Sequence, residues 1–336
     1  MPKNVQTFNA SYGSGAAIGT YFTDSINFNE AQQQLKNQTL AQVRQSAGSL
    51  AEQSSNDGQI MDGVFGAAFP DLTVMASSQT NSDKSSPYSP ILQSLYAAHL
   101  LPSPIFSVYL DKNNNNSSSK NNNEGSVVLG GIHETIKENQ LNYTDVVREH
   151  NSKKYMHWSA TINSIRLDDE LQYQGNDKNS TSSLSTTIIK ITEKNYISKP
   201  TVFAFDTGTT MTLLPADTAK SLILSIWPNA QMDEDLFDAS GTSSFIIPNC
   251  SKSVPSGNLI LELPTTTDGS SSTSTFTLSV PFSNLVEPVN DDDDICQALI
   301  GGWETPIIGN MFLANFITTF DFGEQKRIGF APIPSQ

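Results

Sequence analysis

The sequence predicts an all-β fold with a few short helices, arranged as two lobes. Many short runs of apolar and β-branched residues are separated by turn residues, which is typical of mostly-β proteins. Only two segments show the apolar spacing of a helix. The chain has 336 residues, which is long for a single hydrophobic core and sufficient for two.

Strand-like runs follow one another along most of the chain. The first pair, at residues 106–110 and 125–131, flanks the polar low-complexity stretch 111–124, which we interpret as a surface insertion in a hairpin. Helical patterns are predicted at residues 89–101, which begin with Ser-Pro, and at 216–227. Further strands are predicted at residues 156–167, 185–191, 201–206, 258–264, 276–282, 316–322 and 327–332.

A polar break near residues 146–155 separates two groups of predicted strands. Domain boundaries tend to fall in such exposed polar segments, because few contacts cross them. We therefore expect residues 1–150 to form one lobe and residues 151–336 to form the other.

The charge of the chain excludes two classes of partner. Thirty-four acidic residues against nineteen basic residues give a net charge of −15. Such a chain repels nucleic acid and anionic membranes. No apolar stretch approaches the ~18 residues of a membrane-spanning helix. Residues 1–10 lack the apolar region of a signal peptide, and the last residues lack the hydrophobic tail that precedes a lipid anchor.

Two features are compatible with a secretory route. The two cysteines, Cys250 and Cys296, are an even number that permits one disulfide. Asparagine glycosylation sequons support this route only weakly, because they arise by chance in a chain so rich in asparagine. They occur at Asn9, Asn37, Asn115, Asn116, Asn142, Asn179 and Asn249.

The candidate catalytic loop is Phe-Ala-Phe-Asp-Thr-Gly-Thr-Thr at residues 203–210. The apolar run suits a buried strand that would present Asp206 at its end. Gly208 permits a tight turn close to a substrate. Thr207 and Thr209 supply hydroxyl groups that can hold the loop and its carboxylate. An isolated motif of this kind is weak, since a lone aspartate in it is more often structural.

A second motif about one hundred residues later strengthens the first. Residues 306–332 hold an Ile-Ile-Gly sequence at 307–309, then a helical turn and two strands around Gly323. Together the two stretches resemble the C-terminal lobe of the pepsin-family aspartic proteases. The resemblance implies that Asp206 is a catalytic carboxylate, supported by the loop residues that follow it.

Earlier stretches resemble the same family in the same order. Residues 10–28 resemble its flap hairpin, which places Tyr12, Gly13 and Ser14 at the substrate-binding flap tip. Residues 61–70 resemble the stretch that closes the first lobe, with Val-Phe-Gly at 64–66. By itself, an aromatic residue before Gly-Ser-Gly is more often part of an ordinary turn.

The later stretches of the first half complete the match. Residues 105–134 resemble the long hairpin of the family, although His133 stands where the family usually has aspartate. Cys250 and Cys296 flank the segment where the second-lobe disulfide of the family lies, so the resemblance implies that they are bonded. It also implies a bilobal fold in which 1–150 is a partial N-terminal lobe and 151–336 a complete C-terminal lobe.

The family uses two aspartates, which share a proton and activate a water for acid-pH hydrolysis of peptide bonds. Asp206 is in the only Asp-Thr/Ser-Gly sequence of this chain. The number of residues that separates Asp206 from Gly309, when it is counted back from Gly66, leads to a position before residue 1. We therefore expect the first aspartate to lie outside this sequence and the chain as written to be inactive. The sheet under Tyr12 should then have an unpaired edge and exposed apolar surface.

Three interpretations remain open. The chain is an incomplete aspartic endopeptidase, a non-catalytic peptide-binding relative, or a homodimer that pairs Asp206 with its symmetry mate. The resemblance implies an extended peptide or protein substrate, a monomer, a secreted or vacuolar/lysosomal location, and no metal or organic cofactor. Asp291 to Asp294 lack the glycine-bearing calcium loop, the four histidines lack ligand spacing, and no Gly-x-Ser-x-Gly is present.

Overall fold

The computed structural model describes most of the chain and confirms the mostly-β class with a few short helices. The helices of the described part are α2 (Ile91–Ala97), α3 (Ala216–Ile226) and α5 (Asn310–Leu313), with single 3₁₀ turns at Pro70–Leu72, Glu138–Gln140 and Phe282–Asn284. The described residues are 7–13, 15–28, 33–48, 62–73, 87–110, 125–148, 153–168, 170–175, 185–190, 194–233, 242–250, 254–266, 274–289 and 294–334.

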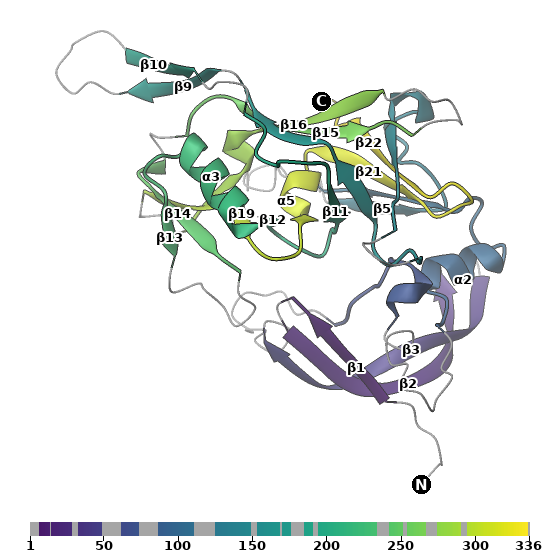
Figure 1. The fold of residues 1–336 in the computed structure, drawn as a ribbon. Helices are drawn as coiled ribbons and strands as arrows, with labels where there is room; N and C mark the ends of the chain where they lie inside the picture. The colour runs from purple at the N-terminus through teal and green to yellow at the C-terminus, as the bar shows by residue number, and fades with distance from the viewer. Residues whose placement is uncertain are drawn as a thin grey trace, which may run out of the picture.

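The N-terminal strands form a three-stranded antiparallel sheet that is set apart from the other sheets (Figure 1). Its inner face has a small core of its own, made by Phe8, Ala10 and Ala17. Both strands of its long hairpin are irregular, with register shifts at Ile18/Gly19 and Asp24/Ile26. The sheet consists of β1 (Thr7–Tyr12), β2 (Gly15–Phe28) and β3 (Gln33–Gly48).

A five-stranded sheet combines strands from both halves of the sequence. The order β5-β4-β21-β22-β6 places β4 against β21 and β22 against β6. The main core behind it is continuous as well, because Phe106 stacks on Phe320 and contacts Trp158. The strands are β4 (Ile105–Tyr109), β5 (Ser126–Leu129), β6 (Asn142–Asp145), β21 (Phe316–Asp321) and β22 (Arg327–Pro332). The division into lobes at residue 150 therefore stays a prediction.

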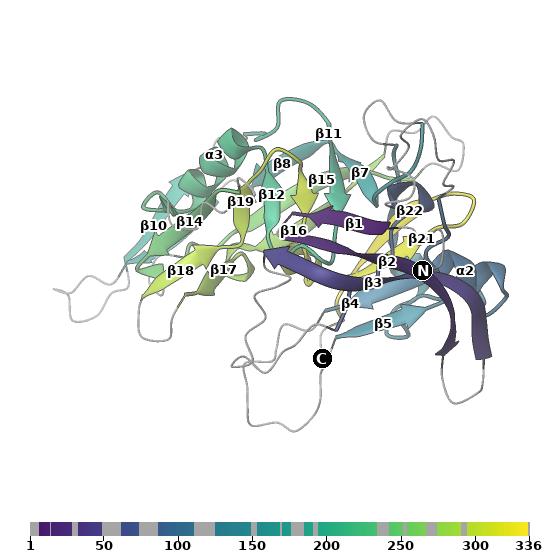
Figure 2. The same ribbon diagram turned by 90° about the horizontal axis from the view of Figure 1, so that it is seen from below.

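The second half of the chain contributes the remaining sheets, seen from below in Figure 2. A five-stranded sheet has the order β19-β12-β20-β11-β7, from β7 (Ser159–Ile162), β11 (Thr201–Phe205), β12 (Thr212–Leu214), β19 (Ile300–Gly302) and β20 (Ile307–Ile308). A three-stranded sheet has β8 (Ser164–Leu167), β15 (Asn258–Pro264) and β16 (Thr275–Pro281). The four-stranded sheet has β13 (Gln231–Asp233), β14 (Ser244–Pro248), β17 (Val286–Pro288) and β18 (Ile295–Ala298), and β9 (Glu170–Gly175) pairs with β10 (Ser185–Lys190).

Each predicted helix and strand has a counterpart in the structure, although several ends differ and one predicted strand is divided in two. The predicted helix 89–101 is shorter, because His99 adopts a left-handed backbone (φ 57°) just after α2 ends. The predicted strand 156–167 is two strands, β7 and β8, which pair with different sheets. The polar strand β3 was not predicted, since it has few β-branched residues. The insertion 111–124 lies outside the described residues.

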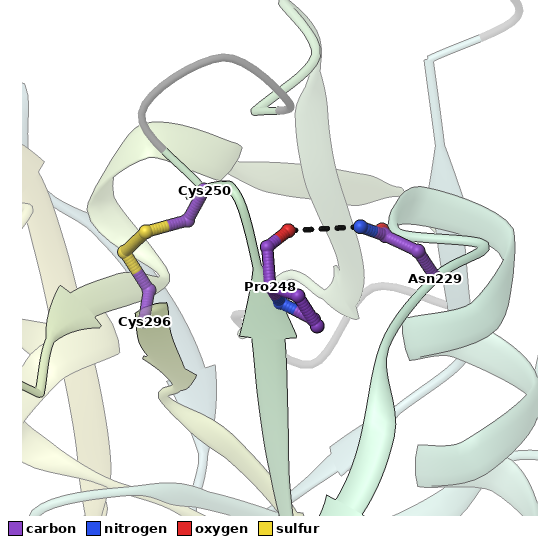
Figure 3. The surroundings of a disulfide bond; sticks show 4 residues. All are labelled: Asn229, Pro248, Cys250 and Cys296. Carbon is purple, nitrogen blue, oxygen red and sulfur yellow. Dashed lines mark hydrogen bonds between the residues drawn. A yellow bond between two sulfur atoms is a disulfide. The ribbon is translucent and has the colours of Figure 1, made fainter. Parts of the chain in front are cut away.

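The disulfide between Cys250 and Cys296 is confirmed. Their Cα atoms are 5.7 Å apart, and the bond ties the end of β14 to β18 (Figure 3). Beside it, the Asn229 side chain donates a hydrogen bond of 2.8 Å to the carbonyl of Pro248. The disulfide thus closes the β14–β18 sheet, and this hydrogen bond links the sheet to the end of helix α3.

Replacing both Cys250 and Cys296 by alanine should lower the free energy of unfolding by about 2–4 kcal/mol. The physical reason is that the bond closes a long loop, 46 residues, and so restricts the unfolded chain. Chemical denaturation under oxidising conditions measures the change. Asn229→Ala is the matched control, because it removes only the neighbouring hydrogen bond and should cost about 1 kcal/mol. The prediction is wrong if the double-cysteine variant loses no more free energy of unfolding than Asn229→Ala does.

Candidate active site

Asp206 lies at the end of a buried strand, as predicted. Strand β11 pairs in parallel with β20, so that Ala204 faces Ile307 and Phe205 faces Ile308. The pairing continues one residue further, since the backbone N–H of Asp206 donates to the carbonyl of Ile308 at 3.0 Å. Phe205 and Ile308 are buried, whereas Asp206 is exposed. The sheet therefore holds the backbone of Asp206 and presents its carboxylate to solvent.

The carboxylate of Asp206 is oriented by its own loop. Oδ1 accepts the backbone N–H of Gly208 at 2.9 Å, and Oδ2 accepts the hydroxyl of Thr209 at 2.7 Å. The N–H of Thr209 also donates to the carbonyl of Asp206 at 3.3 Å. Each carboxylate oxygen thus has a fixed donor. Thr207 is half-buried, and its hydroxyl has no hydrogen-bond partner among the residues described.

Gly309 locks this loop from the other side. A Cβ at Gly309 would collide with the carbonyl of Met211 and would lie 2.7 Å from the carbonyl oxygen of Thr209. The next residue, Asn310, donates its N–H to Thr209 at 2.7 Å. Only glycine therefore permits the close approach between the start of α5 and the loop after Asp206.

The flap tip is the turn between β1 and β2, where Tyr12 pairs with Gly15. Tyr12 is 43% exposed, and partial burial raises the pKa of its phenol above the usual value. Gly13 lies against Trp303: a Cβ built on Gly13 would be 3.8 Å from Cη2 of that indole. Ser14 lies outside the described residues. The structure therefore brings the tip of the N-terminal sheet to a residue of the C-terminal half.

Comparisons with known proteins fit this geometry. A model of the eukaryotic aspartyl protease family matches residues 1–333. The chain belongs to this family. It is 31% identical to mucorpepsin of Rhizomucor pusillus over 334 residues, and 31% identical to mucorpepsin of Rhizomucor miehei over 329 residues. Gastricsin of Homo sapiens is 24% identical over 335 residues, which are 98% of this chain and 67% of that protein.

The chain spans 65% of the length of each mucorpepsin, while 97% of its own residues align. These matches support the pepsin-family resemblance and its mostly-β fold over nearly the whole chain. The roles of Asp206 and the flap residues are implied by the resemblance, and they stay predictions.

By the resemblance, the Val-Phe-Gly sequence at 64–66 in the first half corresponds to the Ile-Ile-Gly sequence at 307–309 in the second half. In the second half this place is covered, since Ile308 is fully buried beside β11. In the first half, Val64 is 62% and Phe65 is 53% exposed, and a Cβ at Gly66 would meet nothing within 4 Å. The apolar surface at Val64 and Phe65 is therefore exposed, although the corresponding surface of the second half is covered by strand β11.

His133 stands where the family usually has aspartate, and it accepts a backbone N–H two residues later, as an aspartate in a turn does. Its Nδ1 accepts the backbone N–H of Thr135 at 3.3 Å, as Asp206 Oδ1 accepts that of Gly208. Its Nε2 lies 2.9 Å from the hydroxyl of Ser126. Nδ1 also lies 2.8 Å from the hydroxyl of Thr135. His133 is buried in the turn after β5, where it packs against Ser126 and Tyr109 of the β4–β5 hairpin and has a structural role.

Trp303 is the site residue that the sequence did not indicate. A single tryptophan after Gly-Gly has no recognisable motif, and its contact with the flap depends on distant parts of the chain. Within the described ranges, no group of three histidine, cysteine, aspartate or glutamate side chains could hold a metal ion. Asp291 to Asp293 fall outside those ranges. No described helix is long and apolar enough to span a membrane.

Proposed function

We propose that this chain contributes one catalytic carboxylate, Asp206, to an aspartic endopeptidase that hydrolyses peptide bonds at acid pH. The observation that carries the proposal is the geometry of the loop. Asp206 is exposed at the end of a buried strand, and both of its carboxylate oxygens are held by loop donors. Asp321 makes the same turn, since its Oδ1 accepts the N–H of Gly323 at 2.9 Å, but it is buried and paired with Arg327, whereas the carboxylate of Asp206 is exposed.

The proposed reaction needs a second carboxylate close to Asp206. Two carboxylates a few ångströms apart cannot both ionise, so they share one proton. The ionised one takes a proton from water as its oxygen attacks the peptide carbonyl carbon. The neutral one donates a hydrogen bond to the developing oxyanion, and the leaving nitrogen is protonated as the C–N bond breaks. Asp206 performs one of these two roles.

The exposed surface at residues 64–66 supports a binding place for the segment that would carry the second carboxylate. In the second half, the equivalent surface binds the strand that leads into Asp206. We therefore propose that a strand carrying a second Asp-Thr/Ser-Gly sequence, from a segment outside residues 1–336, pairs here. The substrate is then an extended peptide between the two carboxylates and the flap tip at Tyr12 and Gly13.

A non-catalytic, peptide-binding role is the second candidate. One observation favours it, namely that Asp206 is in the only Asp-Thr/Ser-Gly sequence of residues 1–336. The disulfide and the exposed sequon asparagines Asn9, Asn37, Asn142 and Asn249 support a secreted or vacuolar/lysosomal glycoprotein in either case. We propose that the chain with its second carboxylate acts as a monomer.

The test compares residues 1–336 with the same chain extended by a segment that supplies the second Asp-Thr/Ser-Gly sequence. Cleavage of a denatured protein is followed from about pH 3 to neutral. We expect no cleavage by residues 1–336 and acid-optimal cleavage by the extended protein. Cleavage by residues 1–336 that requires Asp206 would refute the missing partner and favour a homodimer. An extended protein that binds peptide without cleaving it would establish the non-catalytic role.

A further inference from the structure

Two elements that are distant in the sequence meet at Trp303. Gly13 is in the turn between β1 and β2, and Trp303 directly follows β19. The Cη2 atom, at the outer edge of the indole, would be 3.8 Å from a Cβ on Gly13, which is an ordinary van der Waals distance. The flap tip therefore lies beside the indole of Trp303, and a methyl group on Gly13 would bring the two into contact.

The backbone of Trp303 is tied to the sheet that carries Asp206. Its backbone N–H donates to the carbonyl of Leu214 at 2.7 Å, and the preceding Gly302 pairs with Leu214 in the parallel β12–β19 ladder. Gly302 also exchanges two backbone hydrogen bonds with Ser243, at 2.8 and 2.9 Å. Strand β12 begins a few residues after Asp206. The backbone of Trp303 and the loop of Asp206 thus follow strands of one sheet, β19 and β11.

The flap sheet, by contrast, is fastened at the end away from its tip. There the side chain of Gln38 donates to the carbonyl of Ser89 at 3.1 Å, next to helix α2, and Leu35 enters the main core. Between this end and the tip lies the register shift at Ile18/Gly19, a place where a long hairpin can bend, whereas the shift at Asp24/Ile26 lies at the fastened end itself.

We propose that Trp303 is the positioning residue for the flap: its indole is the platform on which Gly13 rests, and it sets the height of the flap above Asp206. The consequence for substrate, which rests on the proposed function, is that Trp303 forms one end of the peptide-binding space. The positioning itself does not depend on catalysis. It can be measured in the 336-residue chain.

Hydrogen exchange of the flap-tip amides in Trp303→Ala tests the proposal. Removing the platform should speed exchange at residues 11–18 about tenfold, while exchange in β11 and α3 stays unchanged. Trp303→Phe keeps an aromatic ring that is shorter than indole, so it should give an intermediate rate. Unchanged exchange at the flap tip would overturn the proposal. Equal acceleration in β11 and α3 would also overturn it, because Trp303 would then only stabilise the fold.

Gly13→Ala supplies a matched gain of contact, because its new Cβ meets Cη2 of Trp303 at a favourable distance. This variant should slow flap-tip exchange several-fold in the wild-type background and leave it unchanged in the Trp303→Ala background. Equal slowing in both backgrounds would show that the two residues are not coupled, and would overturn the proposal.

Tryptophan fluorescence gives a second readout of the same contact. Trp158 and Trp227 are buried, whereas Trp303 is half-buried, so acrylamide quenching reports mainly on Trp303. Gly13→Ala should reduce this quenching, because the flap then covers the indole for a larger fraction of the time. Quenching that does not respond to Gly13→Ala would count against a flap seated on Trp303. Neither readout requires activity, so failure of this proposal is distinguishable from failure of the proposed endopeptidase function.

Discussion

Asp206→Asn should lower the turnover number of the extended, catalytically complete protein by about a thousandfold or more, with little change in KM. Asparagine has the size and shape of aspartate: its one oxygen can accept the N–H of Gly208, and its NH2 group can donate to the hydroxyl oxygen of Thr209 in place of accepting from it. It cannot take a proton from water or share one with a second carboxylate. The loop geometry should therefore survive while the chemistry is lost. Steady-state cleavage of a peptide at acid pH measures both constants.

Two further variants make this result specific. Thr209→Val removes the hydroxyl that holds Oδ2 at 2.7 Å, and it should reduce turnover by about 10- to 100-fold, because the carboxylate then loses its fixed orientation. Asp217→Asn is the matched control: Asp217 is also followed by threonine, but it is exposed in the first turn of α3. It should leave both constants unchanged. If the Asp206→Asn enzyme keeps a tenth or more of the turnover number, Asp206 is not a catalytic residue.

Gly309→Ala should destabilise the chain by about 3–5 kcal/mol and displace the Asp206 loop. The added Cβ meets two backbone carbonyls, those of Met211 and Thr209, and backbone atoms cannot move aside as a flexible side chain would. The N–H of Asn310 would be pushed away from Thr209 in the same step. Denaturant unfolding measures the stability, and the midpoint should fall clearly below that of the unaltered chain.

The matched control for Gly309→Ala is the equivalent glycine of the first half. Gly66→Ala should change the stability of residues 1–336 by no more than about 0.5 kcal/mol, because a Cβ there meets nothing within 4 Å. In the extended protein the proposed strand covers Gly66, and the same substitution should become costly. If Gly66→Ala stays neutral in an extended protein that is active, the second carboxylate does not enter beside Val64 and Phe65. If Gly309→Ala also leaves the free energy of unfolding unchanged, the close packing between Gly309 and the Asp206 loop does not stabilise the fold.

Much of the candidate site was readable from the sequence because its determinants are local. The apolar run before Asp206, the glycine after it and the hydroxyl of Thr209 act within a few residues of one another. They form the strand end, the tight turn and the carboxylate contacts that the structure contains. The same holds for the predicted strands of the second half, because their β-branched and apolar pattern is a property of each segment. Other strands there, such as β12, β14 and β18, were not predicted. The pairing of Cys250 with Cys296 came from the family resemblance.

The tertiary structure alone decided which distant segments meet. Sequence patterns predicted β4 and β21 as strands, but their pairing joins residues more than two hundred positions apart. Polar β3 has little strand signal of its own, and it is a strand because β2 pairs with it. The contact of Gly13 with Trp303 is of the same kind. Strand propensity and turn chemistry act between near neighbours, whereas these contacts depend on how whole sheets pack, which no short stretch of sequence specifies.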